Sequence, residues 1–463
     1  MSLFKIGARS AGMVFAIISA NAMSQALKPV NEDGSKLPAE LIEKVNVAIN
    51  GDSARLQEVF KDIHKNPELG FMETRTAAII AKELEALGFS VRTGIGKTGV
   101  VGVLRNGDGP VVMYRADMDA NAVEEATGLP YESKVRVLRD GTEEVPVAHL
   151  CGHDAHVTWL LGVAKAMAAL KSEWKGTLIL VGQPAEEPIL GAKAMVADGL
   201  YDKGVPKPDY LIGLHTSPFP TGLVLFKPGD FNAGTDQLDV TFHGIGGHGS
   251  SPHLTKDPVL MASAAIVQYQ FIVSRAINPL NAAVITVGSV QAGADNNVIP
   301  ASALLKINLR WYDEKDRRRM LDGIDRINQS IAAAYNLPAN LKPTTVMKGG
   351  SVVLSNDAGM AKTIQPALNS LLGEKSVIIE APQLMGSEDF HHLVIDNDKH
   401  RYLYMYVGTA KPEDFKRARA EGKQVPYSNH NPDYQVDLDA IPLGAKIGTV
   451  TALEFLAKGT NTE

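Results

Sequence analysis

Two hydrophobic periods run through this 463-residue chain. Residues 53–71 and 72–89 carry apolar side chains three and four positions apart, which predicts two amphipathic helices, with Gly88 placed to end the second. Between residues 100 and 215, short apolar runs alternate with helical patterns. The strand-like runs are VVGVL (100–104), PVVMYRAD (110–117), GTLILVG (176–182) and DYLIGLH (209–215), and the helical ones are HVTWLLGVAKAMAALK (156–171) and LGAKAMVADGL (190–200). This alternation predicts an α/β domain around a mostly parallel sheet.

The pattern changes near residue 231. The following segments read as strand, helix, strand, strand, helix and a short last strand: 237–245, 257–276, 282–290, 303–313, 316–336 and 341–348. This order predicts a small α+β domain, ferredoxin-like, inserted into the larger one. Helical residues 358–373 and 440–457, with strand-like residues 401–408 between them, then return to the first pattern. We therefore expect an α/β domain formed by residues 33–230 and 346–463, and an inserted domain at 231–345.

The first residues form a separate segment. Lys5 and Arg9 precede an apolar run from Ala11 to Ile18, and Ala20-Asn21-Ala22 follows as a small-x-small cleavage site. We interpret residues 1–22 as a secretory signal peptide, because the apolar run is much shorter than the roughly 20 residues that a spanning helix needs. An uncleaved membrane anchor is the alternative. Cleavage would place the mature protein in the periplasm or outside the cell.

Composition and charge narrow the partners of the mature chain. The protein is 45% hydrophobic and 21% charged, with a mean hydropathy of −0.04, as expected of a soluble globular protein. Loss of the signal leaves 44 basic against 52 acidic residues, a net charge near −8. No basic run or aromatic-interleaved patch opposes this acidity. We expect no nucleic-acid partner and no membrane span in the mature chain.

Polar side chains gather at the ends of the predicted strands. YRADMDA supplies Asp117 and Asp119, QPAEE supplies Glu186 and Glu187, and GLHTSP supplies His215. CGHDAH supplies Cys151 and His153 before a helix that Asp154 is placed to cap. Open parallel α/β sheets bind their ligands at such strand ends.

These residue types suit a divalent metal ion. A thiolate, imidazoles and carboxylates on separate loops are ligands for Zn²⁺, Mn²⁺ or a similar ion, and a pair of ions would explain the number of candidates. Of the adjacent Glu186 and Glu187, one can ligate while the other acts as a general base toward a metal-activated water. Hydrolysis of an amide follows naturally. The lone cysteine is the notable member, because a free thiol in an oxidising compartment is a liability unless it is buried or ligated.

Each motif also has a structural interpretation. A single cysteine is usually a small buried hydrophobe, paired glutamates usually lie on the surface, and an isolated histidine can belong to a core. Joint placement at the ends of one sheet favours the metal site. GIGGHG (244–249) matches a dinucleotide fingerprint, but it lies in the inserted domain and lacks the acidic residue about 20 positions on. We do not interpret it as a nucleotide site.

Taken in order, the motifs resemble those of the M20 metallopeptidase family. They are DIHKNPELGFMET, YRADMDA, CGHDAH, GQPAEE, GLHTSP, GGHGSSPH, NNVIPA, GSEDF and NHNP. The cysteine of CGHDAH points to the amidohydrolase branch, which includes hippurate hydrolases, N-acyl-amino-acid deacylases and indole-acetyl-amino-acid hydrolases. The resemblance runs from about residue 52 to the C-terminus.

The resemblance implies roles for individual residues. Two divalent ions (Mn²⁺, Zn²⁺, Co²⁺ or Ni²⁺) would be held by Cys151, His153, Glu187, His215 and His430, with Cys151 as the bridging thiolate. Glu186 matches the general base. Asp119 matches the acidic residue that orients a metal ligand, with Asp117 as the second choice for that role. His149 and His156 are then structural or support the ligands.

The inserted domain resembles the family's lid, which also forms a dimer contact. His248 matches a residue that polarises the scissile carbonyl or holds the substrate carboxylate, and Asn297 and Arg310 match positions that grip substrate; a surface ion pair is the alternative for Arg310. The resemblance thus implies a homodimer through the lid. Residues 134–150 form a longer insert than we expect of this branch; it either reshapes the mouth of the pocket or forms an exposed hairpin around Asp140-Gly141.

The leading hypothesis is a metal-dependent amidohydrolase that removes the acyl group from an N-acyl amino acid. A carboxypeptidase or dipeptidase is the alternative, because both cleave an amide next to a free carboxylate. Two other classes remain: a cysteine-nucleophile hydrolase that uses Cys151 with His153 or His156, and a binding protein without activity. The second would be expected to have lost Glu186 or a metal ligand, and this chain has lost neither.

Overall fold

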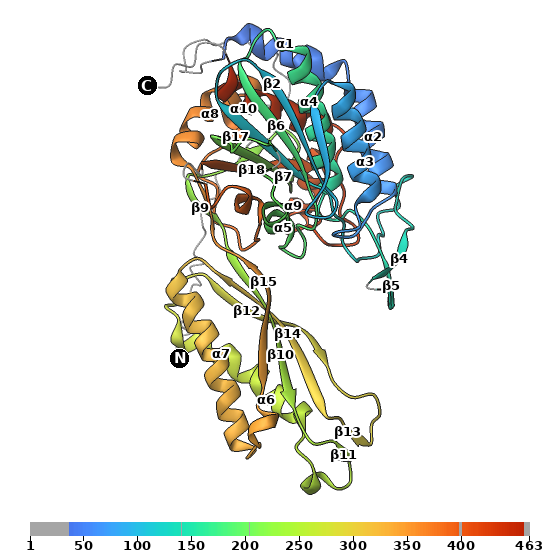
Figure 1. Ribbon diagram of the computed structural model, residues 1–463, viewed down its shortest axis with the longest axis vertical. Coiled ribbons are helices and arrows are strands. Elements are labelled where there is room, and N and C mark those ends of the chain that lie inside the picture. The colour runs from blue at the N-terminus through green and yellow to red at the C-terminus, as the bar shows by residue number, and fades with distance from the viewer. Residues whose placement is uncertain (1–36, 140, 203, 398–400, 458–463) are drawn as a thin grey trace, which may run out of the picture.

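The computed structural model describes residues 37–139, 141–202, 204–397 and 401–457. The proposed signal peptide at residues 1–22 lies outside these ranges. Within them the protein forms a large α/β domain and a smaller α+β domain that extend end to end along the longest axis of the molecule (Figure 1).

A sheet of eight strands forms the centre of the large domain. Its order is β1-β2-β6-β3-β7-β18-β8-β17, and the central strands β6, β3, β7 and β18 run parallel. The bounds are β1 (Ser90–Ile95), β2 (Gly99–Asn106), β3 (Val111–Asp117), β6 (Gly176–Gln183), β7 (Tyr210–Pro220), β8 (Val224–Leu225), β17 (Val377–Ile378) and β18 (Tyr402–Ala410). Strand β6 is buried along its whole length, as expected of a strand covered on both faces. The predicted fold class is confirmed.

Helices cover this sheet and bury its apolar side chains. They are α1 (Ala39–Asn50), α2 (Ser53–Lys65), α3 (Thr74–Ala86), α4 (His153–Ala169), α5 (Gly191–Ala197), α8 (Ala358–Leu372), α9 (Pro412–Ala420) and α10 (Ala440–Leu456). Helix α4 is buried on nearly every side, since it contacts the sheet, α2 and α10. The tip of its Trp159 donates from Nε1 to the carbonyl of Ala440 at the start of α10, 3.0 Å away.

A four-stranded antiparallel sheet, with helices on a single face, forms the centre of the small domain. The chain order is β10 (Gly234–His243), α6 (Pro258–Phe271), β12 (Ala283–Gln291), β14 (Ser302–Trp311), α7 (Glu314–Ala334) and β15 (Thr344–Ser351), which is the predicted order. In the sheet the order is β12-β14-β10-β15. Strand β15 continues this sheet to Ser351, where it still pairs with Thr235, so the expected boundary at residue 345 falls inside a strand.

Short elements complete the described chain. The insert forms a hairpin of β4 (Arg136–Arg139) and β5 (Glu143–Pro146), which projects from the large domain on the side that faces the small one (Figure 1). The others are β9 (Gly229–Asn232), β11 (Gly247–His248), β13 (Val298–Ile299), β16 (Leu354–Asn356) and the short helical turns η2 (Pro252–Leu254), η3 (Ile272–Ala276), η4 (Ala339–Leu341), η5 (Glu374–Ser376) and η6 (Phe390–Leu393).

One helical run in the described chain, Pro258–Ala276, is long and apolar enough to cross a membrane by length and composition. It comprises α6 and η3. One side of it is buried: Met261, Ala262, Ala265 and Tyr269 join the core of the small domain. The run is therefore packed in this domain, and its length and composition are only weak evidence for a membrane span.

Candidate metal centre

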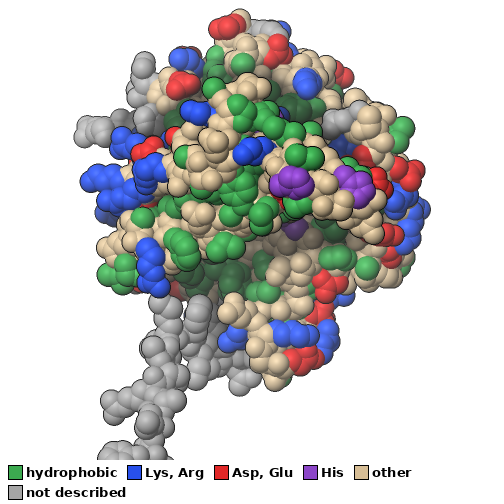
Figure 2. All heavy atoms as spheres, turned by 90° about the horizontal axis from the view of Figure 1, so that it is seen from below, with side chains coloured by type: hydrophobic (Ala, Val, Ile, Leu, Met, Phe, Trp, Pro, Cys, Tyr) green, Lys and Arg blue, Asp and Glu red, His purple; other side chains and the backbone are tan. Residues whose placement is uncertain are grey.

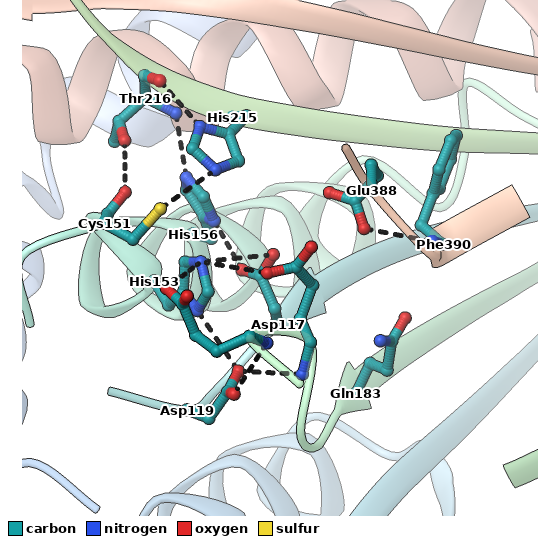
Figure 3. A network of polar contacts seen from close by, with 12 residues as sticks. Asp117, Asp119, Cys151, His153, His156, Gln183, His215, Thr216, Glu388 and Phe390 are labelled. Carbon is teal, nitrogen blue, oxygen red and sulfur yellow. Dashed lines mark hydrogen bonds and ion pairs between the residues drawn. The ribbon is translucent and has the colours of Figure 1, made fainter. Parts of the chain in front are cut away.

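The predicted ligands come together at the carboxyl end of the parallel strands (Figure 3). Asp117 is the last residue of β3, and the loop with Glu186 and Glu187 follows β6. Cys151 and His153 lie at the start of α4. His215 lies inside β7 rather than after it, because β7 keeps pairing with β18 beyond this residue.

Two groups of ligand atoms share the cysteine. Cys151, His153 and His215 offer atoms within 4.8 Å of one another, and so do Cys151, Glu187 and His430. The Cys151 Sγ lies 3.5 Å from His215 Nε2, and Glu187 Oε1 lies 3.3 Å from His430 Nε2. Cys151 therefore belongs to both groups of candidate ligand atoms, and its expected role as a bridging thiolate stays a prediction.

The charge state of Cys151 also suits a ligand. Burial raises the pKa of its thiol, but the nearby His215 and His153 more than compensate and lower it to about 6. The sulfur is therefore a thiolate at neutral pH, the form that binds metals.

The histidines present the nitrogen that a metal would take. His215 Nδ1 donates to the carbonyl of Thr216 at 2.7 Å, so Nε2 is the ring nitrogen that a metal would take. His153 Nδ1 lies 3.3 Å from Asp119 Oδ1, and its buried Nε2 has no hydrogen-bond partner among the described residues. Such a pattern, with one ring nitrogen held and the other left bare, is typical of metal-ligating histidines. The residues present therefore fit a pair of divalent ions.

Asp119 connects a ligand to the loop that carries the candidate base. Its Oδ1 accepts from the backbone N–H of Glu186 at 3.1 Å, and its Oδ2 from that of Glu187 at 3.0 Å. The same carboxylate contacts His153. Asp119 can therefore orient a ligand and the catalytic loop together.

Asp117 has different partners. It accepts from Arg115 Nη1 at 2.7 Å and from His156 Nδ1 at 2.5 Å, and His156 Nε2 in turn accepts from the backbone N–H of Thr216. These two bonds require a neutral His156, and burial lowers its pKa to about 3. Of the two candidates for the orienting role, the geometry therefore favours Asp119, and His156 supports the strand that carries His215.

Glu186 lies in an acidic, buried environment. Burial and the neighbouring Glu388 and Glu187 raise the pKa of its carboxyl well above the ordinary value. Glu388 itself is held by Arg115 and by the hydroxyl of Tyr404. A carboxylate with a raised pKa is suited to accept and return a proton.

Three residues around the site were not predicted from the sequence. Arg115 contacts Asp117, Glu388 and Asp389, and a charged residue inside an otherwise apolar strand was the available signal. Glu73 accepts from the N–H of Ala185 at 2.8 Å, one residue before Glu186, where the backbone is left-handed (φ 46°). Glu388 belongs to GSEDF, a motif to which no role was given.

At the start of α4 the structure differs from two predictions: the helix begins at His153 rather than His156, and Asp154 does not cap it. Gly152, in the left-handed region (φ 87°), is the N-cap, and the helix starts at His153. Asp154 lies in the first turn, where it bonds His64 instead of capping the helix. A side chain at position 152 would strike Thr216 at 2.5 Å, so the metal loop packs directly on β7.

The lid residues divide into two sets. Arg310, on β14, lies near the metal centre, where the negative charge of Glu186 acts on its guanidinium. His248 in β11 and Asn297 just before β13 are exposed, at the end of the small domain farthest from the large one (Figure 1). Within one chain, the structure does not bring these two residues together with the metal ligands. GIGGHG contributes β11, which pairs with β13 rather than opening a helix.

The centre has an open side at His430. Its side chain is 53% exposed, whereas that of His153 is fully buried. His430 has a left-handed backbone (φ 68°), and its N–H donates to the carbonyl of Leu150 beside the metal loop. Substrate can therefore approach from the side on which His430 lies.

Known proteins share this sequence and arrangement. A profile of peptidase family M20/M25/M40 matches residues 113–453. The hippurate hydrolase of Campylobacter jejuni is 40% identical over 336 residues, which cover 72% of this chain and 83% of that protein. Thermostable carboxypeptidase 2 of Saccharolobus solfataricus is 32% identical over 424 residues, which cover 90% and 100%. A Bacillus subtilis structure described as a dinuclear metal binding peptidase from the M20 family superposes with a TM-score of 0.65 at 26% identity, covering 88% of this chain and 99% of that one.

Proposed function

This chain belongs to peptidase family M20/M25/M40, and from that premise we propose that it is a metal-dependent enzyme that hydrolyses the amide bond of N-acyl amino acids. One observation carries the proposal. Cys151 is shared by two groups of ligand atoms, and Glu186 lies beside them with His153 and Glu187. The similarity to a hippurate hydrolase points to the same substrate class.

The reaction follows from the residues around this centre. When bound, two divalent ions lower the pKa of a water molecule and polarise the scissile carbonyl. Glu186 takes a proton from the water molecule while the oxygen of that water adds to the carbonyl carbon. The same carboxyl then delivers that proton to the nitrogen as the C–N bond breaks, so that a carboxylic acid and an amino acid leave.

Asp119 positions the candidate base and the candidate metal ligands relative to one another. Its bonds to the amides of Glu186 and Glu187 fix the direction of the base relative to the ligand carboxylate. Its contact with His153 fixes a metal-binding imidazole at the same time. Displacements of about 1 Å in such a site cost roughly 10²-fold in rate, which explains why one buried carboxylate serves both.

Arg310 is suited to bind the carboxylate of the amino-acid half. It lies close enough to Glu186 for the two charges to interact, and a guanidinium binds carboxylates through two parallel hydrogen bonds. A substrate held in this way would present its amide to the base. Asn297 and His248 remain candidates for contacts supplied by a second subunit.

A metallo-carboxypeptidase is the second candidate. Thermostable carboxypeptidase 2 matches 90% of this chain at 32% identity. A peptide substrate also offers an amide next to a free carboxylate, so the same residues serve both reactions.

A substrate panel separates the two candidates. The full-length enzyme is assayed with N-acetyl, N-benzoyl and long-chain N-acyl amino acids and with dipeptides, each with Mn²⁺, Co²⁺, Zn²⁺ or Ni²⁺ added separately. The proposal expects the highest kcat/KM on an N-acyl amino acid. Faster cleavage of dipeptides would move the assignment to the carboxypeptidase, and no metal-dependent hydrolysis of either class would reject both.

We also propose that the enzyme is a homodimer joined through the small domain. The outward side of the helical run carries exposed Leu260, Val267 and Phe271, and among the described residues the edge strand β12 pairs on one side only, with β14. Seen from below, hydrophobic side chains are exposed across the middle of the surface with some Lys, Arg and His side chains among them, and most acidic side chains lie toward the rim (Figure 2). Exposed apolar patches and open sheet edges are common features of subunit interfaces.

We propose, finally, that the protein is exported. Residues 1–22 support this with two positive charges, a short apolar run and a small-x-small site. N-terminal sequencing of the mature protein from a periplasmic or secreted fraction tests it. A mature chain that begins near residue 23 is expected, and an intact N-terminus in the cytoplasmic fraction would contradict export.

A further inference from the structure

Asn308 and Arg310 lie on the open face of the small-domain sheet. Strand β14 alternates, with Leu305, Ile307, Leu309 and Trp311 turned into the core formed with the helices. Asn308 and Arg310 point the other way, and both are half-buried. In the antiparallel register Arg310 is opposite Thr235, at the end of β10 nearest the large domain.

A relay of two hydrogen bonds holds Arg310. Its Nε donates to Asn308 Oδ1 at 2.7 Å, and Asn308 Nδ2 donates to Thr235 Oγ1 at 3.1 Å. Thr235 is buried, with 1% of its surface exposed. The amide of Asn308 is therefore fixed from behind, with its oxygen directed at the guanidinium.

This relay leaves the far end of the guanidinium available. The Nη1 atom of Arg310 is buried and has no hydrogen-bond partner among the described residues. A buried cationic donor without a partner is costly, so such a group in a native structure calls for a missing partner. With Nε already bonded, the two terminal nitrogens form the edge that can bind a carboxylate bidentately.

We propose that Asn308, supported by Thr235, is a positioning residue that fixes the conformation of Arg310 so that its terminal nitrogens bind the substrate carboxylate. The inference rests on the proposed function, since it assigns a purpose to residues beside the same site. An arginine has many rotamers, and fixing one before binding lowers the entropic cost of recognition. Asn308 thereby contributes to selection of substrates with a free carboxylate.

The test compares two substrates that differ only in this carboxylate. N-benzoylglycine and N-benzoylglycinamide are assayed with the metal-loaded wild-type enzyme, Asn308→Ala, Asn308→Asp and Arg310→Lys. For Asn308→Ala we expect KM for the acid to rise about tenfold, with kcat within about twofold, because one hydrogen bond to a charged group is lost. The kcat/KM for the amide should stay unchanged. Asn308→Asp keeps an acceptor for Nε and should restore most of the affinity for the acid.

Matched controls distinguish this inference from a loss of folding. Thr286 is opposite Asn308 on β12 and is exposed, so Thr286→Ala should leave both substrates unaffected. Equal losses on acid and amide in Asn308→Ala would show a merely structural role and overturn the inference, as would unchanged KM values. If the wild-type enzyme hydrolyses no N-acyl amino acid of the substrate panel, the proposed function fails by itself. Calorimetric binding of N-benzoylglycine to Glu186→Gln with and without Asn308→Ala then still decides the role of Asn308.

Discussion

Glu186 and Glu187 are neighbours with different surroundings, and the difference predicts different losses. Both carboxylates lie 3.9 Å from His153 Nε2, but Glu187 also contacts His430 at 3.3 Å, whereas the carboxyl of Glu186 faces Glu388. Replacement of Glu186 by Gln keeps the shape of the side chain and removes its ability to accept a proton. We expect kcat to fall by about 10²–10⁴-fold with unchanged metal content.

Elemental analysis alongside the hydrolysis assay checks this prediction. Glu187→Gln is the matched control, because it should lose metal as well as activity. Hydrolysis near the wild-type rate by Glu186→Gln would show that another group acts as the base.

Cys151 makes a second prediction at the residue scale. Its thiol has a pKa of about 6, so it is a reactive thiolate once the metals are removed. We expect a chelator to abolish hydrolysis and to speed alkylation of Cys151 by iodoacetamide at pH 7.5, and added Mn²⁺ or Zn²⁺ to reverse both effects before alkylation.

The described chain contains Cys151 as its only cysteine, so labelling is read without ambiguity by mass spectrometry. Hydrolysis that survives complete removal of metal would instead support the cysteine-nucleophile alternative, in which alkylation rather than chelation stops the reaction.

The sequence indicated the residues that cluster at this site better than the groups that hold them in place. Cys151, His153 and Glu187 stand in short motifs of unusual composition, and such motifs can be recognised one segment at a time. Glu73 acts on the loop before Glu186 from a position 112 residues away. Contacts of this kind depend on the packing of separate elements. Glu73 stands in the motif DIHKNPELGFMET, but neither that motif nor the helical period of residues 72–89 indicates which distant backbone group its carboxylate binds.

At the level of elements, the contact between α4 and α10 is unusually close. An added Cβ at Gly444 would lie 2.2 Å from Trp159 Cε2. The indole ring of Trp159 is fully buried and is hydrogen-bonded to the carbonyl of Ala440, so it has little room to move. We expect Gly444→Ala to destabilise the protein by about 1–3 kcal/mol, because overpacking forces the ring or the helix to move.

Thermal unfolding of wild type and variant measures this effect. Gly359→Ala is the control and should lose much less stability, because the nearest atom to an added Cβ would be Asp357 Oδ1 at 3.1 Å. Gly422 has open space around it but is unsuitable, since its positive φ of 81° would strain any side chain. An unchanged melting temperature for Gly444→Ala would contradict the close contact.

Periodicity predicted most of the elements, but α1 was missed although its buried Leu41, Ile42, Val45 and Ile49 follow a helical period. The α/β alternation and the strand-helix order of the small domain follow from side-chain periods of two and about 3.6. Helices α1 and α9 were not predicted. The end of the small domain was placed too early, because β15 carries exposed side chains and two glycines near Ser351 and so lacks the alternation that marks a strand.

At the scale of the whole molecule, His64 joins three distant segments. From α2 it bonds Asp154 at the start of α4 at 2.7 Å and Glu125 at 3.0 Å, all buried. Burial lowers the pKa of His64, but its bonds to Asp154 and Glu125 outweigh this and raise it to about 9. Because the folded pKa lies above that of an unfolded histidine, this stabilisation is complete below about pH 6.5 and is lost as the pH rises toward 9.

Urea unfolding at pH 6.5 and pH 9 should therefore differ by a contribution on the order of 3 kcal/mol from this group. His64→Gln should be less stable than wild type at pH 6.5 and should show a smaller change between the two pH values. An equal change in both proteins would exclude His64 as the source.

The proposed homodimer is a property of the whole molecule, and it bears on how His248 and Asn297 could take part in catalysis. One chain keeps His248 and Asn297 far from its own metal centre (Figure 1), so they can serve catalysis only if another subunit brings them there.

The exposed Val267 and Phe271 lie four positions apart on one helical run and offer an apolar contact for a second copy. We expect a dimer by sedimentation velocity and a monomer after Val267→Asp with Phe271→Asp, because two charges would be buried without partners. Val47→Asp, an exposed apolar position on α1 of the large domain, is the control and should stay dimeric. If the dimer supplies His248, the monomeric variant should lose kcat while it retains metal. A fully active monomeric variant would reject that role for His248, and a monomeric wild-type enzyme would reject the dimer.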